Sequence, residues 1–275
     1  MKLKFTKMEG TGNDFVVIDT REQAIKLNVE NIRFLADRRL GIGCDQLLVV
    51  ALPKNADNAI SYRIYNADGQ EVQQCGNGAR ALGAYIGREH PLDTRIGMES
   101  MSGVVYARAL PDGAVSVNMG VPSFEPALLP FTAPALATEY VLDIGPQSIA
   151  FGAVSMGNPH AVIPVNNVDE ADVNGLGAAF QAHPAFPESV NVGFMQILNR
   201  QEMKLRVFER GVGETLACGT GACAAAAIAQ SLGMTDSKVM IHAPGGDLLV
   251  SWAGEGQNAY LSGACNLVYE GTIIL

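Results

Sequence analysis

The sequence lacks the features that would place it in a membrane, in an oxidising compartment or on nucleic acid. It has no apolar run long enough to span a bilayer, and its first residues, MKLKFTKMEGTGNDF, lack the apolar stretch of a secretory signal. The formal net charge of −9 disfavours nucleic acid, because phosphate binding needs basic surface. The five cysteines are an odd number, which indicates thiols in a reducing cytoplasm. We therefore expect a cytoplasmic protein with no membrane partner and no nucleic-acid partner.

Motifs for metals and cofactors are also missing. The chain has no CxxC, and its four histidines are scattered, which disfavours a zinc site. GVGETLACGTG lacks the Lys-Ser/Thr ending of a P-loop, and CGTGACA lacks the full glycine spacing of a dinucleotide-binding loop. No lysine lies in a motif typical of pyridoxal phosphate sites. We therefore expect neither a metal nor a cofactor.

What the sequence does contain is an internal repeat. QQCGNGARALGA, residues 73–84, resembles LACGTGACAAAA, residues 216–227, and an offset of 143 aligns Cys75 with Cys218. The same offset aligns YRIYNADGQEV with LRVFERGVGET, so that Asn66 meets Glu209. Ordered similarity over such a span predicts a duplicated domain.

Two further pairs of polar residues support the duplication. Asn13 and Asn158 each precede an apolar run, and Gln46 and Asn191 recur in the same way, both at an offset of 145. The Pro-rich segment VPSFEPALLPFTAPA, residues 121–135, is typical of a crossing between two halves.

Local patterns predict that both halves are α/β. Short β-branched or aromatic runs bounded by Gly, Asn, Asp or Pro predict strands, and Ala-rich or amphipathic stretches predict helices. The expected strands contain FVVID, QLLVV, YRIYN, SVNMG, GAVSM, AVIPV, GFMQI and LRVFE, and the expected helices cover 29–39, 76–88 and 219–232. Each half would therefore contain one well-buried helix that begins just after its cysteine.

A cysteine at the start of a helix has a chemical use. The first N–H groups of a helix lack intrahelical partners and favour negative charge, so a thiol there is expected to have a lowered pKa. The same N–H groups can hold a carboxylate. Cys75 and Cys218 therefore each combine a reactive thiol with an anion site, whereas we interpret Cys44, Cys223 and Cys265 as packing residues.

Two opposed thiols suit racemisation without a cofactor. One thiolate removes the proton from an α-carbon, and the other thiol returns a proton on the opposite face. Because an α-hydrogen is a weak acid, donors must hold the carboxylate as charge develops. A duplicated domain supplies the two similar groups that this reaction needs.

The motifs GTGNDF, NADGQEVQQCGNGAR, SMGNPH, VNVGFM and ERGVGETLACGTGACAA together resemble the diaminopimelate epimerase family over essentially the whole chain. The resemblance implies an isomerase, an epimerase that interconverts L,L- and meso-diaminopimelate in lysine and peptidoglycan precursor synthesis. It implies that Cys218 accepts the proton and Cys75 donates it in the usual direction. It implies that Gly76-Asn77 and Gly219-Thr220 bind the reacting carboxylate. The remaining implied substrate contacts are Asn13, Gln46, Asn66, Asn158, Asn191, Glu209 and Arg210, and His160 is a supporting residue or a scaffold residue.

The resemblance also implies a fold. We expect an α/β (α+β) protein of two pseudo-symmetric domains, each with a sheet wrapped around a central helix and with the site in the cleft between them. The expected domains are residues 1–118 together with 264–275, which return to the first domain, and residues 119–263. The family implies a homodimer, no cofactor and no metal.

Three other functions stay open from the residues. A proline or hydroxyproline racemase would use the same paired cysteines, although Arg210 and the amides favour an acyclic substrate with a second charged end. A thiol hydrolase or acyltransferase would need one cysteine and a histidine. A non-catalytic anion-binding protein would use the helix ends alone. The repeated cysteine disfavours the last two, since neither needs two thiols.

Overall fold

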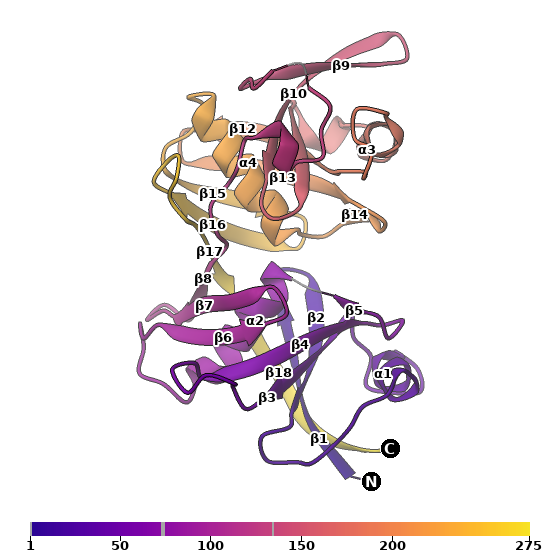
Figure 1. Cartoon of the computed structure of the whole chain (residues 1–275), viewed down its shortest axis with the longest axis vertical. Helices are drawn as coiled ribbons and strands as arrows, with labels where there is room; N and C mark the ends of the chain where they lie inside the picture. Colours follow the sequence, from indigo (N-terminus) through magenta and orange to yellow (C-terminus); the bar gives the residue numbers. More distant parts are fainter. Residues whose placement is uncertain (1, 73–74, 134) are drawn as a thin grey trace. The chain divides into compact units, whose positions relative to one another are not determined.

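The computed structural model describes residues 2–72, 75–133 and 135–275, and the chain divides into two compact units (Figure 1). The N-terminal unit comprises Met1–Asn118 and Ser262–Leu275, and the C-terminal unit comprises Met119–Leu261. Within the described ranges, no helix is both long and apolar enough to cross a membrane.

The sheet of the N-terminal unit follows the order β18–β1–β2–β3–β4–β6–β7–β8. The pairs β2–β3 and β4–β6 are parallel and the others are antiparallel, while the short β5 pairs with the end of β4. The strands are β1 (Lys2–Gly10), β2 (Asn13–Asp19), β3 (Gln46–Ala51), β4 (Ile60–Asn66), β5 (Glu71–Val72), β6 (Ile96–Ser100), β7 (Gly103–Ala109), β8 (Ala114–Asn118) and β18 (Asn266–Ile274).

The C-terminal unit repeats this arrangement in the order β9–β10–β11–β12–β13–β15–β16, again with the third and fifth pairs parallel. The short β14 pairs with the end of β13, as β5 does with β4. The strands are β9 (Tyr140–Ile144), β10 (Gln147–Ser155), β11 (Pro159–Pro164), β12 (Asn191–Asn199), β13 (Glu202–Glu209), β14 (Gly213–Thr215), β15 (Lys238–Ala243) and β16 (Gly246–Trp252). Strand β17 (Ala259–Ala264) begins in this unit and ends in the N-terminal unit. The predicted pseudo-symmetric duplication is confirmed.

The duplication extends to side chains. Arg63 on β4 forms an ion pair with Glu71 on β5. At the aligned positions, Arg206 on β13 pairs with Glu214 on β14 at 2.6 Å. In both units this bidentate pair joins the strand before the cysteine-bearing loop to the short strand beside it.

The sheet of each unit packs against a central helix, which is α2 (Gly76–Gly87) in the N-terminal unit and α4 (Gly219–Ser231) in the C-terminal unit (Figure 1). Both helices are buried along most of their length, and their small residues let the strands approach closely. A Cβ on Gly83 would lie 2.7 Å from the Val115 side chain, and one on Gly152 of β10 would lie 2.4 Å from Ile228 of α4. Gly83 of α2 and Gly152 of β10 are therefore required by this packing.

Two peripheral helices complete the units. Helix α1 (Val29–Ala36) begins with a capping box between Asn28 and Asn31. Helix α3 (Val173–Ala182) begins at Asp172, whose side chain accepts from the Gly175 N–H. Short 3-10 turns cover Pro126–Leu128 and Val168–Glu170.

The Pro-rich segment at 121–135, which the sequence suggests is a crossing, packs into the C-terminal unit. Its Leu129 and Phe131 belong to the hydrophobic core cluster of that unit. Phe131 stacks on Phe186 at a ring distance of 4.8 Å and meets Phe151 edge-on at 5.7 Å. The segment packs against this unit because its apolar side chains contact the aromatic core. Residue 134 lies outside the described residues.

Candidate active site

Both repeated cysteines are the N-cap residues of the two central helices. The Cys75 sulfur accepts a hydrogen bond from the Gly78 N–H at 3.3 Å, and the Cys218 sulfur accepts one from the Gly221 N–H at 3.4 Å. Each sulfur thus partners the third backbone N–H group of its helix, one of the groups that the helix itself leaves unsatisfied. A Cβ on Gly221 would lie 3.2 Å from the Cys218 Cβ atom, so glycine allows this close cap.

In the N-terminal unit, predicted site residues are joined in two pairs. The Asn77 Nδ2 atom donates to Asn13 Oδ1 at 2.6 Å, which connects the start of α2 to the start of β2. Gln46 on β3 donates through Nε2 to Asn66 Oδ1 at the end of β4, at 3.0 Å. The Gln46 Oε1 atom is buried and has no hydrogen-bond partner in the described structure, so this amide has an unused acceptor.

In the C-terminal unit, a chain of contacts leads from the thiol to a buried histidine. The Cys218 sulfur lies 3.4 Å from Thr220 Oγ1, and Asn158 Nδ2 donates to the same hydroxyl at 3.3 Å. Asn158 Oδ1 lies 3.1 Å from His160 Nε2. Because this amide oxygen can only accept, His160 carries its proton on Nε2. Its Nδ1 atom is then a buried acceptor, and it has no partner within the described residues.

Three more of the predicted residues meet near the end of β13: Asn191 begins β12, Glu209 ends β13 and Arg210 follows it in the turn. Asn191 is buried, donates to the Pro159 carbonyl at 2.9 Å and accepts from the Arg210 N–H at 2.9 Å. Glu209 accepts from the Thr215 hydroxyl at 2.6 Å. The exposed Arg210 guanidinium donates to the Glu188 carbonyl at 3.0 Å. These contacts fix Asn191 and Glu209 while leaving Arg210 at the surface.

Burial sets the protonation of the C-terminal cluster. It raises the pKa of the Cys218 thiol well above its usual value, and the charge of Glu209 adds to this effect. The contacts from Thr220 and the Gly221 N–H favour the thiolate but are outweighed. The expectation of a lowered thiol pKa is therefore wrong for Cys218. Burial and the charge of Arg210 lower the pKa of His160 to about 3, so the imidazole is neutral at physiological pH.

The other cysteines lie in the interior. Cys44 belongs to the core cluster of the N-terminal unit, and burial raises its pKa to about 12. Cys223 and Cys265 are also buried. Among residues 2–72, 75–133 and 135–275, no group of three or more His, Cys, Asp or Glu is placed to hold a metal ion.

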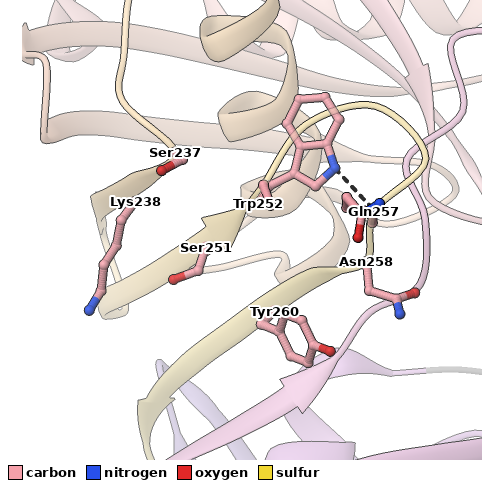
Figure 2. Close-up of a pocket in the computed structure, with 8 residues that line it drawn as sticks. Ser237, Lys238, Ser251, Trp252, Gln257, Asn258 and Tyr260 are labelled. Carbon is pink, nitrogen blue, oxygen red and sulfur yellow. Dashed lines mark hydrogen bonds between the residues drawn. The ribbon is translucent and has the colours of Figure 1, made fainter.

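A separate pocket of about 320 Å³ lies in the C-terminal unit, beside the Trp252 ring (Figure 2). The Trp252 Nε1 atom donates to the Gln257 carbonyl at 3.0 Å, which closes one side of the pocket. The residues that line it are Ser237, Lys238, Ser251, Trp252, Ala253, Gln257, Asn258 and Tyr260. None of them is a predicted site residue.

Sequence reasoning missed three residues that contact the predicted ones. Arg80 is fully buried and donates to Asn77, and Asp45 accepts from Asn13. Thr11 joins them indirectly, because its hydroxyl accepts from Arg80. The available signal was Arg80 itself, a single charged residue in a helix of otherwise small and apolar residues whose counterpart in the other half is Cys223.

The fold is shared with isomerases of small molecules. A hydroxyproline epimerase from Agrobacterium vitis superposes with a TM-score of 0.71 at 14% identity, covering 100% of this chain and 93% of the other. A methylitaconate-delta-isomerase superposes with a TM-score of 0.69 at 14% identity, covering 99% and 95%. At such identities the likeness establishes the fold class, a mixed α/β fold of two similar units.

The sequence comparisons identify the family. The diaminopimelate epimerase model matches residues 5–125 and 152–268. The diaminopimelate epimerase of Chromobacterium violaceum is 51% identical over 277 residues, and that of Nitrosomonas europaea is 50% identical over 277 residues, each covering 100% of both chains. The chain belongs to the diaminopimelate epimerase family.

Proposed function

We propose that this protein is a cofactor-independent isomerase that interconverts L,L- and meso-diaminopimelate by inverting one α-carbon. The observation that carries the mechanism is the pair of N-cap cysteines, Cys75 on α2 and Cys218 on α4, at equivalent places in two duplicated units. Family membership supports the substrate, a biosynthetic precursor of lysine and peptidoglycan.

The proposed chemistry is a proton exchange between two thiols. One cysteine, as thiolate, takes the α-proton and becomes a thiol, and the carbon retains the electron pair. The other cysteine, as thiol, gives its proton to the opposite face of the carbon and becomes a thiolate. No net proton is gained or lost, and the roles exchange in the reverse direction. In the usual direction we assign Cys218 as the acceptor and Cys75 as the donor.

The reacting carboxylate would be held by the helix ends. Backbone N–H groups of Gly76-Asn77 and Gly219-Thr220 begin α2 and α4, where unsatisfied donors and the helix dipole favour an anion. Negative charge spreads from the carbanion onto this carboxylate in the transition state, so fixed donors there lower the barrier.

Glu209 explains how a buried thiol can become a base only when substrate is present. Burial raises the pKa of Cys218 most, and the charge of Glu209 raises it further. A substrate ammonium bound beside Glu209 would cancel that charge and lower the pKa of Cys218. The thiolate would then form next to the α-carbon that it must deprotonate. His160, neutral and bonded to Asn158, would support this arrangement.

The other polar residues suit the distal, unreacting end of a diamino diacid. Arg210 can bind a carboxylate bidentately, and amides can bind either an ammonium or a carboxylate without adding charge. The residues proposed to contact substrate through side chains are Asn13, Gln46, Asn66, Asn158, Asn191, Glu209 and Arg210.

A cytoplasmic homodimer belongs to the same proposal. Strand β18 pairs with β1, and the residues of β18 are mostly exposed, including Leu267, Val268, Tyr269 and Ile274. An open, apolar strand edge favours association, and an antiparallel strand can pair with its own copy across a two-fold axis. A second copy of this chain at the β18 edge would cover it.

The experiment that tests the function measures conversion of L,L-diaminopimelate to the meso form by chiral chromatography. Wild-type protein under reducing conditions should reach a mixture of both isomers, and Cys75→Ala and Cys218→Ala should each lose at least about 10³-fold in kcat. Cys44→Ala is the matched control, because Cys44 is a buried thiol of the core, and it should retain activity. Racemisation of proline or hydroxyproline instead would assign the protein to the alternative activity.

A further inference from the structure

We infer that Arg80 is a positioning residue that orients the Asn77 and Asn13 side-chain amides, so that the start of α2 presents N–H donors to a carboxylate. This inference rests on the proposed function, because it names what the substrate carboxylate meets at that helix end. Arg80 does not take part in the proton transfer.

The Arg80 guanidinium is fully buried, and its neighbours are the Asn77 and Thr11 side chains and the buried Cys265 thiol. Its Nη1 atom donates to Asn77 Oδ1 at 2.8 Å, and its Nη2 atom donates to Thr11 Oγ1 at 2.6 Å. Its Nε atom has no partner, and no carboxylate in the described parts of the chain forms an ion pair with it. Burying an unpaired charge is costly, so an anion bound close by would offset a cost that folding alone does not recover.

The guanidinium determines the direction of a chain of hydrogen bonds. Arginine has only donors, so the Asn77 atom facing it must be the amide oxygen. The Asn77 nitrogen then donates to Asn13 Oδ1 at 2.6 Å. The Asn13 nitrogen in turn faces Asp45 Oδ2, an acceptor, at 3.3 Å.

Both ends of this chain are therefore unambiguous. Arg80 can only donate and the Asp45 carboxylate can only accept, so neither amide can rotate by 180° without placing like groups against each other. The Asn13 nitrogen carries a second hydrogen, and a carboxylate accepts such a hydrogen whereas an ammonium cannot. The fixed amides and the buried positive charge thus both favour an anion at the start of α2.

The neighbouring turn is built around the guanidinium. Thr11 and Gly12 join β1 to β2 with positive φ angles of 53° and 81°, the conformation of a tight hairpin turn. The left-handed conformation is unfavourable for β-branched threonine, yet it brings the Thr11 hydroxyl to Arg80. A Cβ on Gly10 would lie 2.7 Å from the Cys265 sulfur and 3.6 Å from Arg80 Nη2. The turn Gly10-Thr11-Gly12 therefore packs close to the Arg80 guanidinium, and Asn13 follows it directly in the sequence.

Arg80→Met tests this inference, with Arg33→Met as the matched control on the exposed surface of α1. The readouts are kcat and KM for L,L-diaminopimelate, and inhibition constants for meso-diaminopimelate diamide and for the corresponding free acid under identical conditions. We expect Arg80→Met to lower kcat/KM at least tenfold and to reduce the preference for acid over amide at least tenfold. A rotated Asn77 amide would offer an oxygen that repels a carboxylate and accepts from a carboxamide. Arg33→Met should change neither quantity.

The melting temperature separates positioning from simple structural support. Because Arg80 is a buried charge without a carboxylate partner, Arg80→Met should melt at the wild-type temperature or above it. Arg80→Lys should recover part of the acid preference, since it keeps the charge and a donor. A lower melting temperature combined with an unchanged acid-to-amide ratio would overturn the inference.

A second variant covers the case in which Arg80→Met does not fold. Asn77→Asp keeps an acceptor for Arg80 but cannot donate to Asn13, so the protein should fold while the preference for the acid is lost. Wild-type preference in Asn77→Asp would overturn the inference. If the wild-type protein does not epimerise diaminopimelate, the proposed function itself is refuted. If the wild type is active and the variants keep its kcat/KM and its preference for the acid, only the role of Arg80 is refuted.

Discussion

Thr11 offers a test of the buried network that uses stability alone. Its hydroxyl accepts from the fully buried Arg80 at 2.6 Å, and its backbone has a φ of 53°. Thr11→Val removes the acceptor and keeps the β-branched side chain in the left-handed region. Thr11→Gly removes the acceptor and also the conformational strain. Thr11→Ser keeps the hydroxyl.

The magnitudes follow from these contacts. A hydrogen bond to a charged group contributes about 1.5–3 kcal/mol, so Thr11→Val should lower the free energy of unfolding by about 2 kcal/mol. The left-handed conformation costs a non-glycine residue about 1–2 kcal/mol. Replacement by glycine relieves this cost, but about 0.4–1 kcal/mol is lost again because glycine makes the unfolded chain more flexible. Thr11→Gly should therefore be less destabilising than Thr11→Val by about 0.5–1 kcal/mol.

Differential scanning calorimetry measures these differences. At about 2–4 °C per kcal/mol for a chain of this size, Thr11→Val should melt about 4–8 °C below the wild type. Thr11→Gly should melt between the two, and Thr11→Ser should melt close to the wild type. A Thr11→Val protein as stable as the wild type would refute the contribution of the hydroxyl. A Thr11→Gly protein less stable than Thr11→Val would refute the strain.

Two further predictions concern the thiol and the sheet edge. Glu209→Gln removes the charge that raises the pKa of Cys218, so the alkylation of Cys218 by iodoacetamide should shift to lower pH in the substrate-free protein; an unchanged profile would contradict the assigned role of Glu209. Val268→Lys places a charge on β18, where Val268 is 52% exposed, and should convert a dimer to a monomer in sedimentation, whereas Leu128→Lys at an exposed site of the C-terminal unit should not. A dimer that survives Val268→Lys would remove the β18 edge from the proposal.

Much of the fold could be predicted because duplication repeats the signal. Asn13, Gln46 and Asn191 each begin a strand that continues as a largely apolar run, and the two central helices begin just after their cysteines as expected. Neither alanine-rich helix depends on remote contacts for its local preference. The offset of 143 therefore predicts both the duplicated architecture and the positions of the two cysteine-capped helices.

Elements whose residues serve tertiary contacts escaped prediction. Helix α3, VNGLGAAFQA, contains two glycines that lower its helix propensity. One of them, Gly177, is needed because a Cβ there would lie 2.4 Å from Phe208 of β13. Strand β18, in contrast, was expected at 264–275 from the family resemblance, although its burial pattern shows no regular alternation. Packing against a neighbour, as at Gly177, is not visible in the local sequence.

The candidate site shows the same limit. The helix N-termini are local features and were predicted, together with their effect on a thiol. The burial of Cys218 and its proximity to Glu209 depend on the folded chain, and they reverse the direction of the pKa shift. Arg80 and Thr11 are 69 residues apart in the sequence, so their contact could not be inferred from spacing.

The central claim, that two different thiols serve the two faces of one α-carbon, is tested most directly by early-time deuterium labelling. Reduced protein is mixed with L,L-diaminopimelate in heavy water, and both isomers are analysed by mass spectrometry before one tenth of the substrate is converted. We expect one deuterium in the meso product and almost none in the recovered L,L substrate, because the second thiol carries a solvent deuteron while the first still holds the abstracted proton. Equal early labelling of both isomers, or labelling that persists when Cys75 and Cys218 are both replaced by alanine, would contradict it.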